Sequence, residues 1–353
     1  MQLTIAEHHD TDVPPEASAP FPPMPLVCSS FKPGECRMTI EAMENETSRA
    51  FAWAEYGYFR GEPEKSCKML ESFLDHPDPA LRLPALLIYC FDNLSLDRIH
   101  LAAFGLSCMR EKTLGDADSA RTPLSAMKAF VSEAASTLLH LQPSALSHSA
   151  EDAAPLIARL PAGLKLLSFY VQAHRAYMDG DYARSLGIVQ TALSLYVETY
   201  PVPSIYLHLV AAMDLMSLRR PGEARDHFLA AWGLAKPDGL LQPIGEHHGL
   251  LQGLIEVCLK KDSPEDYERV IAITYRFSAG WRKLHALQTD ESIADNLTTT
   301  EFTVAMLANR GWTNKEIAAH MGISANTVKH YVSAVYAKLG ISNRRELKSY
   351  MLR

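Results

Sequence analysis

A short segment near the C-terminus carries polar side chains at helical spacing and no acidic residue. Within residues 324–339, four polar positions recur three or four residues apart: Asn326, Lys329, His330 and Ser333. On a helix these positions share one face, because each residue turns the chain by about 100°. An amide, a cation, an imidazole and a hydroxyl are groups that hydrogen-bond the edges of base pairs in the major groove of double-stranded DNA. The spacing therefore predicts a helix face that reads base pairs.

Other polar residues stand where a phosphate backbone would pass. The first turn of a helix has unpaired N–H groups that bind phosphate, and Thr327 lies in such a turn. We expect seven residues to contact the DNA backbone: Thr313, Asn314, Ser324, Thr327, Lys338, Arg344 and Arg345.

The helices that must hold these residues have clear start and stop signals. Residues 298–301 and 313–316 both read Thr-x-x-Glu, the capping box that begins a helix. With glycines as stops, the helices are expected over residues 298–311, 313–322, 324–340 and from Asn343 onward. A short helix, a tight turn with Gly322 and a longer helix form a helix-turn-helix arrangement. The opposite, apolar face of the third helix should pack on the first two helices.

The charge of the chain changes sign between its two parts. The whole chain of 353 residues has a net charge of -7, but residues 297–353 hold eight basic and three acidic residues, a net charge of +5. The remaining 296 residues hold 26 basic and 38 acidic residues, a net charge of −12. A basic domain attracts phosphate. The pattern also suggests autoinhibition, in which the acidic part competes with DNA for the basic face.

The same C-terminal residues resemble the LuxR/GerE-type DNA-binding domain of bacterial transcription regulators. The resemblance is carried by Leu297-Thr298-x-x-Glu301, Gly311-x-Thr313-Asn314-Lys315-Glu316-Ile317-Ala318, Ile323-Ser324-x-x-Thr327-Val328-Lys329, Lys338-Leu339-Gly340-Ile341 and Arg345-Glu346-Leu347. It implies a four-helix domain that binds DNA as a homodimer and recruits or blocks RNA polymerase. It assigns base reading to Lys329, His330 and Ser333, and it implies a dimer surface on the last helix at Leu347, Tyr350 and Met351.

Two positions depart from the pattern of that family. Thr300 stands where an arginine is usual, and Tyr331 stands where a histidine is usual. Tyr331 lies beside the apolar stripe of its helix, so it should substitute in packing. Thr300 removes one possible phosphate or inter-helix contact.

Residues 38–287 repeat a helical hairpin of another kind. Around Gly180, small residues, a Gly-Asp turn and flanking aromatics resemble the tetratricopeptide repeat (TPR). Similar turns stand at Gly61, Pro221-Gly222 and Lys261-Asp262. We predict an all-α chain: a TPR-like helical-hairpin repeat array followed by a four-helix LuxR-type helix-turn-helix domain. Six tyrosines at helical spacing should pack between the repeats rather than line a ligand pocket: Tyr170, Tyr177, Tyr182, Tyr196, Tyr200 and Tyr206.

The domain boundaries follow from composition. Seven prolines between residues 14 and 33 predict that residues 1–37 form an extended or disordered tail. The repeat domain then covers residues 38–287, an acidic polar linker residues 288–296, and the DNA-binding domain residues 297–353.

Several classes of site lack their signatures. The chain has no phosphate-binding loop, no Cys-x-x-Cys pair, no readable catalytic triad and no apolar stretch of membrane length. We therefore predict a cytoplasmic protein that is not an enzyme, does not bind a membrane, and has no cofactor and no metal. The adjacent histidines His8-His9 and His247-His248 should lie at the surface. Cys28 and Cys36 could form a redox pair, but we expect buried or free thiols.

These observations leave two functions open. The first is a DNA-binding transcriptional regulator controlled by its helical-repeat domain, and the second is a TPR-like protein-interaction adapter with weak or lost DNA binding. The effector of the repeat domain, whether peptide, protein or small molecule, is not named by any pattern in the sequence.

Overall fold

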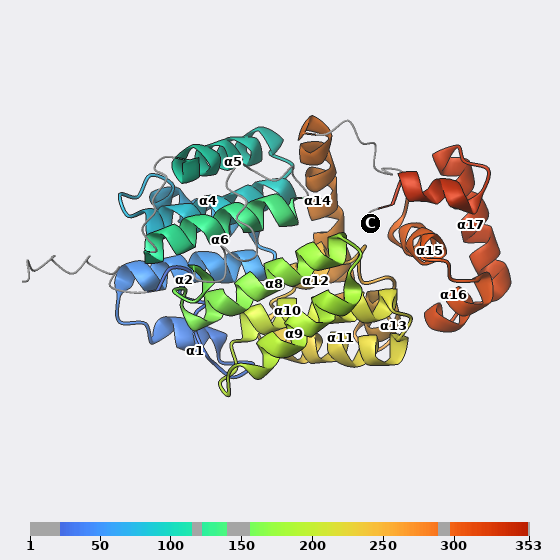
Figure 1. Ribbon diagram of the computed structural model, residues 1–353, viewed down its shortest axis with the longest axis horizontal. Helices are drawn as coiled ribbons and strands as arrows, with labels where there is room; N and C mark the ends of the chain where they lie inside the picture. Colours follow the sequence, from blue (N-terminus) through green and yellow to red (C-terminus); the bar gives the residue numbers. More distant parts are fainter. Residues whose placement is uncertain (1–21, 115–121, 140–155, 289–296, 352–353) are drawn as a thin grey trace, which may run out of the picture.

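The computed structural model describes residues 22–114, 122–139, 156–288 and 297–351. These residues form helices and connecting turns, and none of them belongs to a β-strand. The helices before residue 289 are α1 (Cys36–Glu41), α2 (Glu46–Phe59), α3 (Pro63–Leu70), η1 (Glu71–Phe73), α4 (Pro79–Ser95), α5 (Ile99–Leu114), α6 (Pro123–Leu138), α8 (Ala162–Met178), α9 (Tyr182–Ser194), α10 (Pro201–Ser217), α11 (Pro221–Ala235), η2 (Lys236–Asp238), α12 (Gln242–Glu246), α13 (Leu254–Leu259) and α14 (Pro264–Gln288). The all-α class is confirmed (Figure 1).

Four pairs of helices are joined by the same turn. The pairs are α2/α3, α4/α5, α8/α9 and α10/α11, and each turn has a residue of positive φ: Gly61, Asp97, Gly180 and Arg219. The N–H of the next residue then bonds the carbonyl five positions back, as in Asp181 to Ala176 at 3.0 Å and Arg220 to Leu215 at 2.8 Å. This bond satisfies a carbonyl at the helix end. Helical hairpins thus stand at three of the predicted turns, whereas their kinship with TPRs stays a prediction.

Small residues let the paired helices approach closely. Ser66, Ser185 and Ala224, which follow three of these turns, are fully buried. A Cβ added to Gly57 on α2 would meet Ser66 of α3 at 3.4 Å, the limit of ordinary contact. These positions therefore set the spacing between paired helices, as the sequence predicts.

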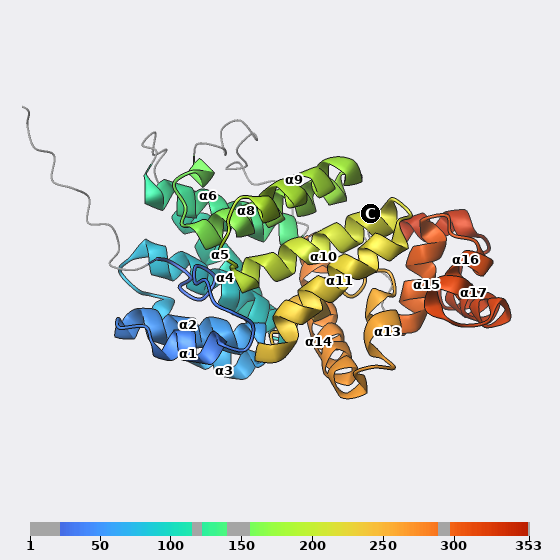
Figure 2. The ribbon, with the colours of Figure 1, turned by 90° about the horizontal axis from the view of Figure 1, so that it is seen from below.

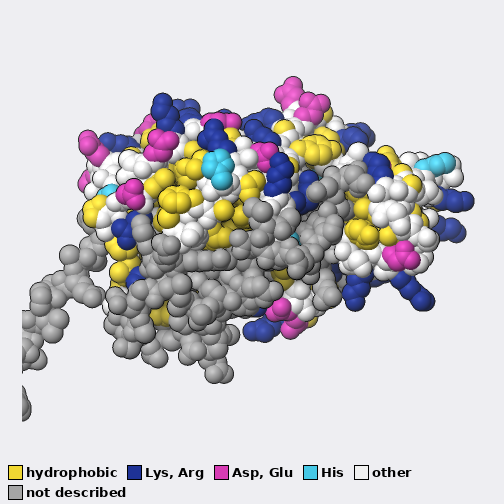
Figure 3. Space-filling model, turned by 90° about the horizontal axis from the view of Figure 1, so that it is seen from above, with side chains coloured by type: hydrophobic (Ala, Val, Ile, Leu, Met, Phe, Trp, Pro, Cys, Tyr) yellow, Lys and Arg dark blue, Asp and Glu magenta, His cyan; other side chains and the backbone are white. Residues whose placement is uncertain are grey.

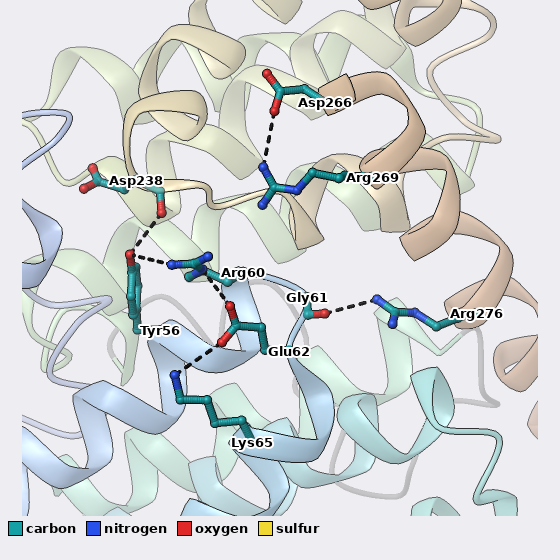
Figure 4. A network of polar contacts seen from close by, with 9 residues as sticks. All are labelled: Tyr56, Arg60, Gly61, Glu62, Lys65, Asp238, Asp266, Arg269 and Arg276. Carbon is teal, nitrogen blue, oxygen red and sulfur yellow. Dashed lines mark hydrogen bonds and ion pairs between the residues drawn. The ribbon is translucent and has the colours of Figure 1, made fainter. Parts of the chain in front are cut away.

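The helical domain closes on itself through α14. This helix contacts α4, α5, α12 and α13, so the end of the domain returns to its beginning. In the network of Figure 4, Arg276 of α14 donates a hydrogen bond to the Gly61 carbonyl at 3.1 Å, and Tyr56 of α2 donates one to the Asp238 carbonyl at 3.2 Å. The array is therefore not an open superhelix, and its interior is bounded on several sides.

The N-terminal segment is part of the core. Leu26 and Val27 are fully buried, and their N–H groups bond the buried carboxyl group of Glu55 at 2.8 and 3.3 Å. Gly163 of α8 packs so closely that a Cβ there would lie 2.1 Å from the Val27 carbonyl oxygen. The prediction of an extended or disordered tail is therefore wrong for residues 22–37, and residues 1–21 lie outside the described part. The prolines excluded regular structure but not burial.

Other predictions meet mixed outcomes. His247 and His248 are each 3% exposed, so their predicted surface position is wrong, while His8 and His9 lie outside the described residues. Cys28, Cys36 and the four other cysteines are free thiols.

The expected linker falls on residues 289–296, which are not described, and Gln288 ends α14. Among the described residues, no helix is both long and apolar enough to span a bilayer.

Candidate nucleic-acid interface

Four elements build the C-terminal domain, which lies at one end of the helical domain (Figures 1 and 2). They are α15 (Thr299–Asn309), α16 (Asn314–Met321), α17 (Ala325–Leu339) and the 3-10 helix η3 (Arg344–Ser349). Both predicted capping boxes are present: Thr298 and Glu301 exchange hydrogen bonds, as do Thr313 and Glu316. Ser324 caps α17 through a bond from the Thr327 N–H at 3.0 Å. The expected helix-turn-helix is therefore in place.

A compact apolar core fixes the orientation of α17. Val328 and Val335 on its inner face are buried, as are Ile317 of α16 and Val304 of α15. Gly322 between α16 and α17 has a φ of 65°, which a residue with a side chain adopts only at a cost. This glycine permits the sharp turn that sets α17 across α16.

The outer face of α17 is open to solvent. Asn326, Lys329, His330 and Ser333 are all exposed, and α17 contains no acidic residue. Asn326 and His330 lie within 3.3 Å through Nδ2 and Nε2, so their polar groups form one surface. Lys and Arg side chains project from this free end of the molecule (Figure 3). The structure thus brings together the four residues that the sequence assigns to base reading.

The residues assigned to the DNA backbone divide into two groups. Thr313, Ser324 and Arg345 are exposed, and Asn314 and Thr327 are half-buried at the first turns of their helices. Lys338, by contrast, bonds the carboxylate of Glu301 at 2.6 Å. Although burial acts to raise the pKa of Glu301, Lys338 and the Thr298 groups bring it below its ordinary value. Lys338 therefore ties α17 to α15.

Arg344 has a structural role that the sequence does not reveal. Its Nε donates to the Ala308 carbonyl at 2.8 Å, and its Nη2 donates to the carbonyl of Trp312. Ala308 lies in the last turn of α15 and Trp312 follows the helix, so Arg344 ties η3 to the end of α15. The contact of Arg344 with the DNA backbone stays a prediction, and two of its donor atoms are already used within the domain.

The predicted dimer surface is largely buried within the domain. Leu347 is 1% exposed and Met351 is 5% exposed, and only Tyr350 is half-exposed. In the 3-10 helix η3, side chains three residues apart point the same way, so Arg344 and Leu347 both face α15. The assignment of Leu347 and Met351 to a dimer surface is therefore wrong.

The sequence also misses the residues that dock this domain on the helical domain. Arg219 pairs with Glu316 at 3.3 Å, Arg310 donates to Tyr177 at 2.9 Å, and the ring of His320 bonds the Gln252 carbonyl at 3.0 Å. These contacts use α15 and α16, and none of those between described residues uses α17. The described residues of the helical domain therefore leave the outer face of α17 exposed, and the autoinhibition by charge stays a prediction. No local signal marks these pairs, since their partners lie 68 to 133 residues apart in the sequence.

Comparison with known proteins agrees with this geometry. Residues 295–351 match the family model of bacterial regulatory proteins of the luxR family. The C-terminal domain is a LuxR-type helix-turn-helix domain. The LuxR-type domain comprises the segment in which the capping boxes, the turn at Gly322 and the exposed face of α17 occur together.

Two relatives are similar to part of this chain. "Probable transcriptional regulatory protein SgaR" of Hyphomicrobium methylovorum is 61% identical over 41 residues, 12% of this chain and 19% of the relative. The DNA-binding transcriptional activator DevR/DosR of Mycobacterium tuberculosis is 39% identical over 64 residues, 18% of this chain and 30% of the relative. The matches thus span less than a third of these relatives, and no solved structure matches the chain.

Proposed function

We propose that this protein is a DNA-binding transcriptional regulator whose α17 enters the major groove. One observation carries the proposal: α17 presents Asn326, Lys329, His330 and Ser333 to solvent, without an acidic residue, from a rigid helix-turn-helix core. An exposed cation and three hydrogen-bonding groups on one face suit base edges, and the nearby first turns suit phosphates. The relatives named as regulators support the same role.

The docking of the LuxR-type domain supports control by the helical domain. Because the contacts lie on α15 and α16, the two domains can be joined while the face of α17 stays open to DNA. A change in the helical domain would then reach α17 through these two helices. We propose a regulatory role without catalysis, in which this control recruits or blocks RNA polymerase.

Binding as a homodimer to a palindromic site is part of the proposal. A single domain offers few contacts, and two-fold pairing doubles them over half-sites about 10 base pairs apart. Since Leu347 and Met351 are buried, the pairing surface must involve other residues of the chain.

Selection of duplexes from a random DNA pool by the full-length protein tests the function. We expect a symmetric consensus bound about 10³-fold more tightly than a scrambled duplex, in a fluorescence anisotropy titration. The logarithm of the affinity should fall linearly with the logarithm of salt concentration, since phosphate contacts release counterions. If no sequence is enriched and all duplexes bind equally weakly, the hypothesis of a transcriptional regulator fails and that of a protein-interaction adapter takes its place.

A further inference from the structure

A cavity of about 250 Å³ lies inside the helical domain and reaches the LuxR-type domain. Its walls come from α2, α4, α6, α8, α10, α12 and α14, and from Leu297, Thr299 and Phe302 at the start of the LuxR-type domain. A cavity of about 150 Å³ is large enough to admit benzene, so this one has room for a ring with a short substituent. Its size therefore suits a small molecule rather than a peptide.

The cavity wall is rich in aromatic side chains. Among them are rings from α2, α4, α8, α10 and α14: Tyr58, Phe91, Tyr170, Tyr206, Phe277 and Trp281. Phe91 and Phe277 are stacked at 5.9 Å, and Tyr170 and Tyr206 lie 4.8 Å apart. Such walls favour a ligand with an aromatic ring and also attract a cation over their faces. The expectation that Tyr170 and Tyr206 serve packing alone is therefore incomplete.

One carboxyl group faces this cavity. Glu246, at the end of α12, accepts hydrogen bonds from Tyr58 at 2.5 Å, from Gln242 at 2.9 Å and, at the longer distance of 3.5 Å, from Tyr206. These three donors are neutral. Burial raises the pKa of Glu246 to about 7 against the effect of these bonds. The side chain still keeps some accessible surface, which its position in the cavity wall explains.

A buried carboxylate bonded to neutral donors is stabilised by a cation that enters beside it. The weakly bonded oxygen of Glu246 has capacity for a further donor, and the aromatic rings surround the space in front of it. We propose that this cavity binds a small aromatic amine, whose ammonium group pairs with Glu246 and whose ring lies between the aromatic side chains. Arg282 also lines the cavity from α14, so an anionic ligand is the alternative that a test must separate.

The cavity is placed to couple such a ligand to DNA binding, and this step rests on the proposed function. Phe302 of α15 lines the cavity and packs against Gly249, where an added Cβ would lie 2.7 Å from its ring. The same helix holds α17 through the Glu301–Lys338 pair and the shared core. A ligand that moves Phe302 therefore moves the helix on which α17 is packed.

Three matched probes test the ligand class with the full-length protein and without DNA: 2-phenylethylamine, neutral 2-phenylethanol and anionic 3-phenylpropionate. Binding is followed by isothermal titration calorimetry, with tryptophan fluorescence as a second readout, because Trp281 lines the cavity. We expect the amine to bind at least about tenfold more tightly than the alcohol, and the carboxylate not to bind. Equal binding of all three probes, preference for the carboxylate or no binding by any probe would overturn the proposal.

Three variants locate the site. Glu246→Gln keeps the size of the side chain and should abolish the preference for the amine over the alcohol. Ala134→Leu fills the cavity from α6 and should weaken the binding of both the amine and the alcohol. Glu268→Gln, at an exposed position of α14, should change the binding of neither. Circular dichroism checks that each variant is folded. If Glu246→Gln does not fold, the Ala134→Leu result and the probe series still decide the question.

The outcome separates this inference from the proposed function. A protein that selects a DNA sequence but prefers no amine contradicts the ligand proposal alone. A protein that binds the amine through Glu246 but selects no DNA sequence contradicts the regulator proposal alone.

Discussion

Arg310, which caps the end of α15, donates a hydrogen bond from Nη2 to the hydroxyl group of Tyr177 at the end of α8, at 2.9 Å. Its guanidinium group lies 5.4 Å from the ring centroid of Tyr177 and 5.0 Å from that of Tyr182. On the other side of the interface, Arg219 lies 5.8 Å from the ring of Trp312. Each domain thus inserts one arginine against the aromatic residues of the other, which fixes their orientation from both sides.

Arg310→Ala should loosen this docking. The substitution removes the cation beside the rings of Tyr177 and Tyr182 and the hydrogen bonds that Arg310 donates to their hydroxyl groups. The LuxR-type domain should therefore separate more often from the helical domain. Small-angle X-ray scattering should show a larger radius of gyration. Arg345→Ala is the control, because Arg345 is exposed on the same domain; an unchanged radius in Arg310→Ala would contradict the docking role.

Lys329→Ala should weaken specific DNA binding. If Lys329 bonds a base edge, its loss costs about 1–3 kcal/mol and relaxes the preference at one base pair. Fluorescence anisotropy with the selected duplex and single-base variants measures both effects. Lys261→Ala, at an exposed position of the helical domain, should leave the affinity unchanged. Equal affinity of the Lys329 and Lys261 variants would remove Lys329 from the interface.

Arg344→Ala should affect stability, whereas Arg345→Ala should affect DNA binding. Arg344 bonds carbonyls at the end of α15, so its loss should lower the free energy of unfolding by about 1.5–3 kcal/mol. Arg345 is exposed, so its loss should leave stability unchanged and reduce the salt dependence of DNA binding by about one charge. Urea unfolding and salt titration distinguish the two. A stable Arg344→Ala protein with impaired DNA binding would support the original prediction for that residue.

Gly163→Ala tests whether the N-terminal segment is packed. Its methyl group would overlap the backbone of Val27, so the segment must shift, and we expect a loss of about 1–3 kcal/mol in urea unfolding. Gly187→Ala on α9 meets no neighbouring atom and should stabilise the protein by about 0.5–1 kcal/mol. Similar gains in both variants would mean that residues 24–28 are not fixed against α8.

Asp214 and Glu55 should each contribute a loss of stability as pH rises from about 4 to 8. Burial raises the pKa of Asp214 from 3.8 to about 8 despite the nearby Ser185 hydroxyl group, and burial raises the pKa of Glu55 to about 8. Between the ordinary pKa of each carboxyl group, about 4, and its pKa in the folded protein, about 8, the folded protein keeps a proton that the unfolded chain releases. Deprotonation in this range therefore favours unfolding. Relative to the unchanged protein, Asp214→Asn should gain melting temperature as pH rises across this range, whereas Glu268→Gln should not. An identical pH dependence of the melting temperature in the Asp214→Asn and unchanged proteins would contradict this account.

The sequence predicts best what depends on neighbours along the chain. The capping boxes of α15 and α16 and the exposed face of α17 are patterns with a spacing of three or four residues, and a helix converts such spacing directly into position. The hairpin turn at Gly180 follows for the same reason, because its positive φ is a local requirement.

What depends on distant partners was not predictable. In the sequence, Arg344 cannot be told from the other cations of its domain, because no neighbouring residue in the chain indicates that the carbonyls of Ala308 and Trp312 are its acceptors. Leu347 and Met351 form an apolar pattern that is the same whether it faces another protomer or the core of its own domain. Glu55, a carboxyl group among apolar residues of α2, was the one available signal that a backbone segment docks there.

Phe302 has a thermodynamic consequence that extends beyond its packing. If the cavity binds a ligand and α17 binds an operator as proposed, the two binding equilibria are linked, because the helix of Phe302 bounds the cavity on one side and supports α17 on the other. Linkage is reciprocal: by whatever factor an occupant of the cavity changes the affinity for an operator, the operator changes the affinity for that occupant. The promoter is then itself an effector, and the protein on its operator senses a different ligand concentration from the protein free in the cell.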